Sequence, residues 1–288
     1  MKALVVGADS AIGRGLMSAL VRRGDSVIGT SRRSDATARG FLALDLAERN
    51  APAALLPKAD VVFFCAAMTG FRACRENPDL ARAVNATAPV ALARRLVGAG
   101  SRVVLLSTSA VFDWSTPLVP PGRKTCATSV YGRTKAEAEA GFLSFGRSAS
   151  VIRFAKVLEP GAKLFLDWID ALRGGRQARA FSDLRMAPVS LDDALAALLA
   201  VADDPEGGIY QYSGAVDISY LDAARHLARR LGRDTSLVVE GLAREAGIPP
   251  EEITYFSSLD SGRVADLLGR AVPDPFKVID AVFGCAGS

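Results

Sequence analysis

Short apolar runs alternate with longer amphipathic stretches over the first two thirds of the chain. The apolar runs are rich in β-branched residues and predict strands at 3–6, 26–30, 41–44, 60–65, 102–107 and 150–154. The stretches between them are rich in alanine and leucine and predict helices, notably at 12–23, 79–99 and 134–145. Strands that are apolar on both faces and separated by helices favour a parallel sheet covered on both sides. Because such crossovers are right-handed, the pattern predicts an α/β fold with a doubly wound parallel Rossmann sheet.

The regular alternation weakens after Lys156. Helices are expected at 162–172, 191–201 and 220–231, with a last strand at 208–212. We therefore expect residues 1–156 to form the sheet domain, with 189–214 returning to it. Residues 157–188 and 215–288 would then form a smaller, interleaved C-terminal substrate lobe.

Composition narrows the class of protein. The 288 residues are 50% hydrophobic, which supplies a packed core and excludes a disordered chain. The apolar runs are too short to cross a bilayer, and the first strand begins too early to leave room for a signal peptide, so a cytoplasmic location without membrane contact is expected. The formal charge is only +4 and the arginines are scattered, so nucleic-acid binding is not expected.

Cysteine and histidine usage argues against a metal site. Cys65, Cys74, Cys126 and Cys285 lack the Cys-x-x-Cys spacing, and the only histidine is His226. We expect no metal, reduced thiols, and a structural or surface role for His226. Acid–base chemistry then has to come from other side chains.

A glycine-rich turn follows the first strand directly. It contains Gly7, Ser10, Ala11, Ile12 and Gly13, and a helix follows. Glycine lets the backbone turn tightly beside a pyrophosphate, while the free N–H groups of the helix N-terminus meet its charge. Ser10 is small and can cap the helix. The context of strand, turn and helix predicts a dinucleotide site, the alternative being an ordinary strand–helix turn.

The second strand ends at Ser31, Arg32 and Arg33, with no carboxylate before Asp35. An NAD-preferring site usually carries a carboxylate here for the ribose hydroxyls, whereas arginines pair with a 2′-phosphate. We therefore predict a preference for NADP(H), with NAD(H) also accepted. In the alternative, the two arginines only solvate the strand end.

The chain offers an acid–base pair four residues apart. Tyr131 and Lys135 would lie one turn apart on one helix face, where the ammonium favours the phenolate and lowers the tyrosine pKa. The fifth strand ends in the hydroxyl residues 107–109, at the sheet edge where ligands bind in such folds. Glycine turn, hydroxyls and Tyr-x-x-x-Lys together indicate chemistry at a carbonyl or carbinol.

These motifs resemble the extended short-chain dehydrogenase/reductase superfamily, and within it they are most similar to dTDP-4-dehydrorhamnose reductases and related sugar-nucleotide epimerases. The resemblance reaches to about Gly214. Besides the glycine turn, it is carried by Asp45-Leu46, Ala66-Ala67-Met68-Thr69, Ala83-Val84-Asn85-Ala86, Ser107-Thr108, Val111-Phe112-Asp113 and Val130-Tyr131-Gly132-Arg133-Thr134-Lys135.

The resemblance implies roles for the catalytic residues. Tyr131 would donate a proton to a substrate carbonyl during hydride delivery. Lys135 would hold the nicotinamide ribose and lower the Tyr131 pKa, and Thr108 would hydrogen-bond the reacting oxygen.

It also implies binding residues. Asp45 and Leu46 would contact the adenine, and Ala66 and Ala67 would line the cofactor channel. Thr69 and Arg185 would bind the substrate, Arg185 on its pyrophosphate, although a surface salt bridge is the alternative for Arg185.

The chain departs from the family pattern in two places. Ser109 and Ala110 replace the polar and aromatic residues that reductases carry after the threonine, and they supply no carboxylate for the dehydratase route. Lys156 is unusual so close to a nicotinamide pocket, and its role stays open.

The predicted function is therefore that of an NAD(P)H-dependent reductase of a keto group on a nucleotide-linked sugar. A homodimeric protein is compatible with this function. The alternatives are a nucleotide-sugar epimerase and a non-catalytic, cofactor-binding regulatory homologue.

Overall fold

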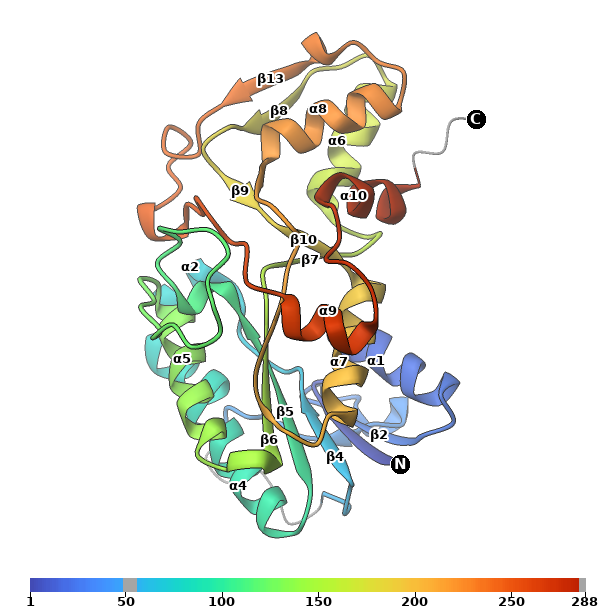
Figure 1. The fold of residues 1–288 in the computed structure, drawn as a ribbon, viewed down its shortest axis with the longest axis vertical. Coiled ribbons are helices and arrows are strands. Elements are labelled where there is room, and N and C mark those ends of the chain that lie inside the picture. Colours follow the sequence, from blue (N-terminus) through green and yellow to red (C-terminus); the bar gives the residue numbers. More distant parts are fainter. Residues whose placement is uncertain (49–55, 285–288) are drawn as a thin grey trace.

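A seven-stranded parallel sheet forms the centre of the computed structural model, which describes residues 1–48 and 56–284. Its order is β11-β6-β5-β4-β1-β2-β3, so the strand order reverses beside β1. Figure 1 labels four of these strands, β2, β4, β5 and β6. The strands are β1 (Lys2–Val6), β2 (Ser26–Ser31), β3 (Leu42–Ala43), β4 (Val61–Phe64), β5 (Arg102–Thr108), β6 (Ala149–Phe154) and β11 (Gly208–Tyr212). The predicted doubly wound α/β fold is confirmed.

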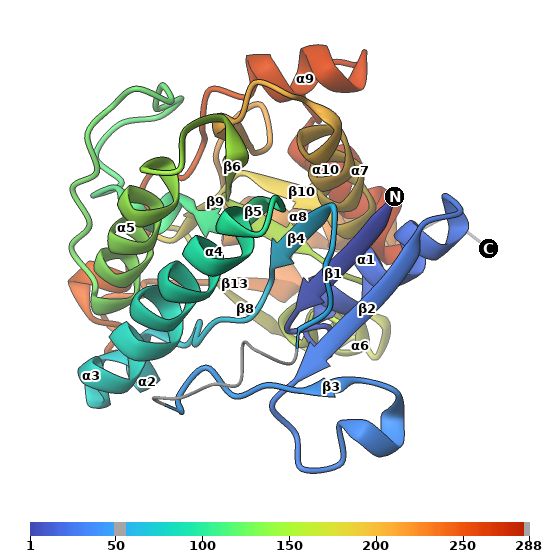
Figure 2. The ribbon, with the colours of Figure 1, turned by 90° about the horizontal axis from the view of Figure 1, so that it is seen from below.

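Helices cover both faces of this sheet (Figure 2). One layer contains α1 (Ala11–Arg22) and α7 (Leu191–Asp203), and the other contains α4 (Ala88–Gly98) and α5 (Val130–Leu143). Successive side chains of a strand point to opposite faces. Accordingly, Ala3 and Val5 of β1 belong to the core under α1 and α7, whereas Leu4 and Val6 belong to the core under α4 and α5.

The region predicted as one helix over 79–99 is divided in the structure. It contains α3 (Pro78–Arg82), a single π-helical turn (Ala83–Thr87) and α4, and it is preceded by α2 (Phe71–Glu76). Pro89 near the start of α4 has no N–H to donate, which breaks the regular α-helical pattern at this point.

Helix α5 begins four residues before the predicted start at residue 134. Its N-cap is Ser129, whose hydroxyl accepts a hydrogen bond from the Gly132 N–H at 3.0 Å. The earlier start matters because it brings Tyr131 into the same helix as Lys135.

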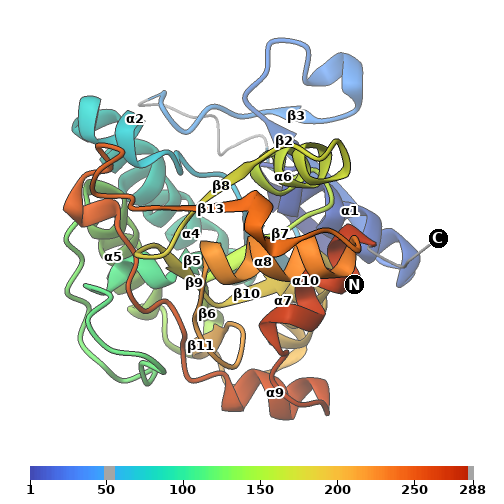
Figure 3. The ribbon, with the colours of Figure 1, turned by 90° about the horizontal axis from the view of Figure 1, so that it is seen from above.

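A smaller lobe lies over one end of the sheet (Figure 3). It contains α6 (Lys163–Arg173), α8 (Tyr220–Arg230) and α10 (Pro275–Phe283) around a separate hydrophobic core. Two strand pairs accompany these helices, namely β8 (Ala178–Phe181) with β13 (Val238–Gly241), and β9 (Arg185–Met186) with β12 (Ile218–Ser219).

The lobe and the sheet are interleaved. Strands β7 (Lys156–Leu158) and β10 (Pro188–Ser190) pair where the chain crosses between them. Helix α9 (Gly262–Leu268) lies in a segment assigned to the lobe from the sequence, yet it packs against α7 and β11. Its Val264 belongs to the core beneath α1 and α7.

Five single-turn helices complete the described chain, namely η1 (Thr37–Arg39), η4 (Ser109–Val111), η5 (Gly146–Ser148), η6 (Thr235–Leu237) and η7 (Pro250–Glu252). In residues 1–48 and 56–284, no helix has the length and apolar character needed to cross a membrane.

Candidate active site

A cavity of about 650 Å³ opens at the carboxyl ends of β1, β2 and β4. This is the edge of a doubly wound sheet at which ligands bind, beside the reversal of strand order. The predicted cofactor residues that line it are Gly7, Ser10, Arg32, Asp45, Leu46, Ala66 and Ala67.

The glycine turn is shaped by close backbone packing. Gly7 has φ +84°, and a Cβ atom there would lie 2.6 Å from the backbone of Ala66. A Cβ atom on Gly13 would lie 2.3 Å from the carbonyl oxygen of Gly7. The Ser10 hydroxyl donates to that carbonyl at 2.9 Å and accepts from the Gly13 N–H at 3.0 Å. Only glycine therefore fits at either position.

The remaining predicted cofactor residues do not line this cavity. Ala11, Ile12 and Gly13 form the first turn of α1 behind the loop. Ser31 and Arg33 are instead bound to Asp9, whose carboxylate accepts from the Ser31 hydroxyl and from Arg33 Nε, both at 3.1 Å. The role of Asp9 was not predicted from the sequence. Because Asp9 holds Arg33, Arg32 is the one of the two adjacent arginines that lines the cavity.

Asn85 in the π-helical turn fixes one wall of the cavity. Its amide accepts from the Met68 N–H at 2.7 Å and donates to the Met68 carbonyl at 3.0 Å and to the Thr134 hydroxyl at 3.1 Å. The side chain is buried, and Met68 lines the cavity. Asn85 stands in the motif Ala83-Val84-Asn85-Ala86 that carries the family resemblance, but no role was predicted for its side chain.

The three predicted catalytic residues come together at the end of β5. Thr108 is the last residue of that strand, and its side chain hydrogen-bonds Tyr131. Lys135 is buried, and its Nζ donates to the Leu106 carbonyl at 2.6 Å. Helix α5 approaches this closely because residue 132 is glycine; a Cβ there would lie 1.9 Å from the Ala110 carbonyl oxygen.

The titration of this pair differs from the sequence expectation. Burial raises the pKa of Tyr131 to about 12, against the lowering effect of the Thr108 hydrogen bond. Burial also lowers the pKa of Lys135 to about 8, opposed by the nearby Glu139 carboxylate and by Cys65. Desolvation therefore raises the tyrosine pKa where the sequence predicted that the lysine would lower it. A protonated phenol is the form that can donate a proton to a carbonyl oxygen.

An aromatic wall stands beside Tyr131. The Phe71 ring meets Tyr131 edge-on at a centroid distance of 5.5 Å, and its contact with Trp114 is also edge-on, at 6.0 Å. Trp114 has φ +57°, which is uncommon for a bulky residue, and its buried Nε1 has no hydrogen-bond partner in the described part of the chain. The sequence reasoning missed both Phe71 and Trp114.

The predicted substrate residues lie outside the cavity. Thr69 is exposed after β4, and Arg185 is exposed in β9, where its N–H donates to the Thr254 carbonyl at 2.8 Å. Lys156 begins β7; its side chain is exposed, yet the surrounding protein lowers its ammonium pKa by desolvation. Among the described residues, neither Arg185 nor Lys156 forms a salt bridge.

Other candidate groups lie elsewhere. His226 pairs with Asp280 at 2.8 Å inside the lobe, and Cys65, Cys74 and Cys126 are free thiols, while Cys285 lies outside the described residues. Over 1–48 and 56–284, no three histidine, cysteine or acidic side chains are grouped to hold a metal.

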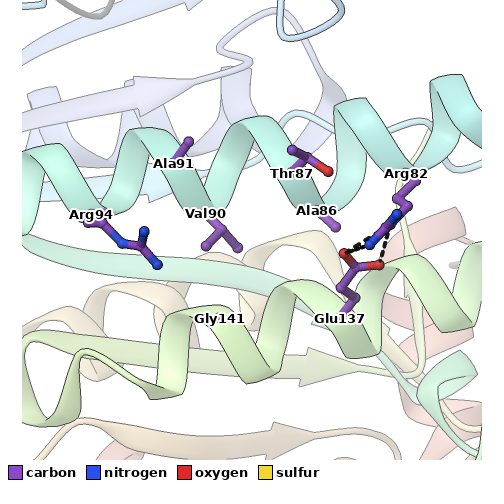
Figure 4. Close-up of a pocket in the computed structure, with 8 residues that line it drawn as sticks. All are labelled: Arg82, Ala86, Thr87, Val90, Ala91, Arg94, Glu137 and Gly141. Carbon is purple, nitrogen blue, oxygen red and sulfur yellow. Dashed lines mark hydrogen bonds and ion pairs between the residues drawn. The ribbon is translucent and has the colours of Figure 1, made fainter.

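A second hollow, of about 420 Å³, lies between α4 and α5 (Figure 4). Glu137 of α5 and Arg82 at the end of α3 form an ion pair at its rim, at 2.9 Å. None of the predicted catalytic or cofactor residues lines this hollow.

The fold, the glycine turn and the Tyr–Lys pair at the end of β5 define an extended short-chain dehydrogenase/reductase, which confirms the resemblance seen in the sequence. The profile described as "RmlD substrate binding domain" matches residues 1–273, so the chain belongs to that family.

Three curated relatives have known or assigned roles. The chain is 25% identical to the probable low-salt glycan biosynthesis reductase Agl14 of Haloferax volcanii, over 98% of each chain. It is 29% identical to the dTDP-4-dehydrorhamnose reductase of Mycolicibacterium smegmatis, over 82% of this chain and 71% of the relative. It is also 25% identical to the methionine adenosyltransferase 2 subunit beta of Xenopus laevis, over 96% of this chain and 85% of the relative.

The fold has close counterparts among solved structures. The dTDP-4-dehydrorhamnose reductase of Bacillus anthracis, solved in complex with NADP, has a TM-score of 0.83 over 99% of both chains at 16% identity. At that identity the match concerns the fold alone.

Proposed function

We propose that this protein is an NADP(H)-dependent reductase of a keto group on a nucleotide-linked sugar. The observation that carries the proposal is the contact of Thr108 with Tyr131 at the end of β5, with the buried Lys135 one turn further along α5. The relatives named as dTDP-4-dehydrorhamnose reductase and as a probable glycan biosynthesis reductase support the substrate class.

The residues around the larger cavity suit a dinucleotide. Its volume of about 650 Å³ lies within the range of small-ligand sites, roughly 300–1,000 Å³. The first N–H groups of α1 have no intrahelical acceptor, which suits a pyrophosphate, and Gly7 keeps the loop free of side-chain bulk. Asp45 and Leu46 line the cavity where the adenine would lie, and Arg32 is available for a 2′-phosphate.

The reaction divides between the cofactor and the chain. When bound, the reduced nicotinamide supplies the hydride. Tyr131 donates its phenolic proton to the carbonyl oxygen, and Thr108 orients that oxygen by a hydrogen bond. The Lys135 ammonium stabilises the phenolate left on Tyr131 and holds the ribose. Asn85 links Met68 in the cavity wall to Thr134 of α5 through its hydrogen bonds and so fixes the position of that wall.

We assign the nucleotide end of the substrate to the lobe. Arg185 in β9 carries an exposed guanidinium without a salt bridge in the described chain, which suits a diphosphate. Thr69 directly follows Met68, which lines the cofactor cavity. The phenyl edge of Phe71 against Tyr131 provides an apolar surface for the sugar.

Two alternatives predict different cofactor behaviour. An epimerase would oxidise and re-reduce the sugar without net consumption of the nicotinamide. A regulatory homologue is suggested by the relative named as subunit beta of methionine adenosyltransferase 2, and it would bind the cofactor without turnover. The protonated phenol of Tyr131 beside Thr108 favours turnover, because a role in cofactor binding alone does not require a proton donor there.

The test is a panel of nucleotide-linked keto sugars with NADPH, followed by loss of the nicotinamide absorbance. The proposal predicts stoichiometric NADPH oxidation with at least one dTDP- or UDP-linked keto sugar. Conversion of a sugar without net NADPH loss would establish the epimerase, and binding without any conversion would establish the regulatory homologue.

A further inference from the structure

Three charged side chains are fully buried in the described residues, and they belong to one group. These are Lys135 and Glu139 of α5 and Arg153 of β6. A buried charge is costly unless it is paired, so their gathering beside Tyr131 calls for an explanation in terms of the site.

Arg153 holds Glu139 with a two-pronged ion pair. Arg153 Nη2 donates to Glu139 Oε2 at 2.7 Å, and Nε donates to Oε1 at 3.0 Å. Arg153 Nη1 also donates to Gln211 Oε1 at 2.9 Å, and its guanidinium lies 4.9 Å from the centre of the Phe112 ring. Both charged side chains are only 2% exposed. The carboxylate is therefore fixed in position by the guanidinium.

The same carboxylate reaches the catalytic strand and helix. The Ser107 hydroxyl, one residue before Thr108, donates to Glu139 Oε1. Glu139 follows Lys135 by one turn of α5, so the two side chains share a helix face. The Lys135 Nζ donates to the Leu106 carbonyl, which precedes Ser107 in β5.

The surroundings of Lys135 contain few other groups that could compensate its charge. The ionisable groups around it are Tyr131 on its own helix, Cys65 after β4 and the Arg153–Glu139 pair. Burial raises the pKa of the Cys65 thiol to about 12, so that thiol is neutral at ordinary pH. Glu139, paired with Arg153, is therefore the acid whose field opposes the desolvation that lowers the Lys135 pKa.

We propose that Glu139, clamped by Arg153, is a positioning residue that keeps the Lys135 ammonium charged next to Tyr131. The proposal rests on the function assigned to Lys135 above. It gives the buried ion pair a role in the reaction besides joining α5 to β6.

The direct test titrates Lys135 in the cofactor-free protein. Carbon-13-labelled lysine is followed by NMR as a function of pH, and the Lys135 signal is assigned by its loss in Lys135→Arg. Wild type is compared with Glu139→Gln, which removes the charge but keeps the size of the side chain. Gln211→Met is the matched control, because it breaks a hydrogen bond of Arg153 without changing the charge.

The proposal predicts that Glu139→Gln lowers the Lys135 midpoint by about one to two pH units, as expected for loss of one charge one helical turn away in protein. Gln211→Met should leave the midpoint unchanged. In an activity assay, the alkaline limb of the kcat/KM profile should move to lower pH by the same amount in Glu139→Gln only.

The variant Glu139→Gln leaves the buried Arg153 guanidinium without its carboxylate partner, so this variant can fail to fold. The double variant Glu139→Gln/Arg153→Met removes both charges of the pair and leaves no unpaired buried charge from it. Its Lys135 midpoint should also fall below that of wild type. An unchanged midpoint in a folded Glu139 variant overturns the proposal. Because the titration needs neither cofactor nor turnover, this failure is distinct from failure of the proposed reductase activity.

Discussion

We predict that Arg32 makes the protein bind NADPH more tightly than NADH. It lines the cavity beside the end of β2, whereas its neighbour Arg33 is held by the Asp9 carboxylate at 3.1 Å. Replacing Arg32 with alanine removes a guanidinium that would pair with the 2′-phosphate of NADPH. NADH carries a hydroxyl at that position and gains little from the guanidinium.

The magnitude follows from the kind of bond that is lost. A hydrogen bond between charged groups contributes about 1.5–3 kcal/mol, and about 1.4 kcal/mol corresponds to a tenfold change in affinity. Arg32→Ala should therefore weaken NADPH binding by roughly 10- to 100-fold and change NADH binding by less than about threefold.

The assay is fluorescence titration of NADPH and NADH into wild type, Arg32→Ala and Arg39→Ala. Arg39 is the matched control, because it is exposed on the same segment and does not line the cavity. The reasoning is refuted if wild type prefers NADH, or if Arg32→Ala weakens both cofactors equally.

Three further outcomes follow from the site and the packing around it. The kcat/KM for reduction should fall as the pH rises through about 8, because Lys135 of the ligand-free enzyme loses its charge there. Tyr131, with a pKa of about 12, stays protonated over this range. A kcat/KM profile that is flat up to pH 10 contradicts this prediction. By thermal unfolding, Trp168→Phe should cost about 1–3 kcal/mol more than Trp114→Phe, because only the Trp168 indole N–H has an acceptor, at 3.0 Å. Gly132→Ala should lower the free energy of unfolding by about 1–3 kcal/mol and slow turnover, because its Cβ would lie 1.9 Å from a carbonyl oxygen. A Gly132→Ala variant that unfolds and turns over like the wild type would refute the packing argument.

The fold could be predicted from the sequence where elements are long and strongly patterned. The strands β1, β4, β5 and β6 are nearly continuous apolar runs, and α1 begins at a serine cap after a glycine turn. The short strands of the lobe, such as the two-residue β9 and β12, give no such pattern, because their stability comes from pairing with distant segments.

The residues of the candidate site divide in the same way, into those marked by a sequence motif and those whose role depends on distant contacts. Seven of the twelve predicted cofactor residues line the larger cavity, because they stand in motifs next to strand ends. Asp9, Asn85 and Phe71 were missed, since their roles depend on three-dimensional contacts with Arg33, Met68 and Tyr131. The raised tyrosine pKa was missed for a related reason, because the degree of burial is set by packing and not by spacing in the sequence.

The central claim is that Tyr131 protonates a keto group on a nucleotide-linked sugar as the nicotinamide is oxidised. The most direct measurement is single-turnover oxidation of NADPH by a dTDP-linked 4-keto sugar, with wild type and Tyr131→Phe compared at equal saturation. General acid catalysis contributes typically 10²- to 10⁴-fold, so the phenylalanine variant should be slower by about that factor while binding NADPH normally. Equal rates in the two proteins, or no oxidation by wild type with any nucleotide-linked keto sugar, would contradict the account.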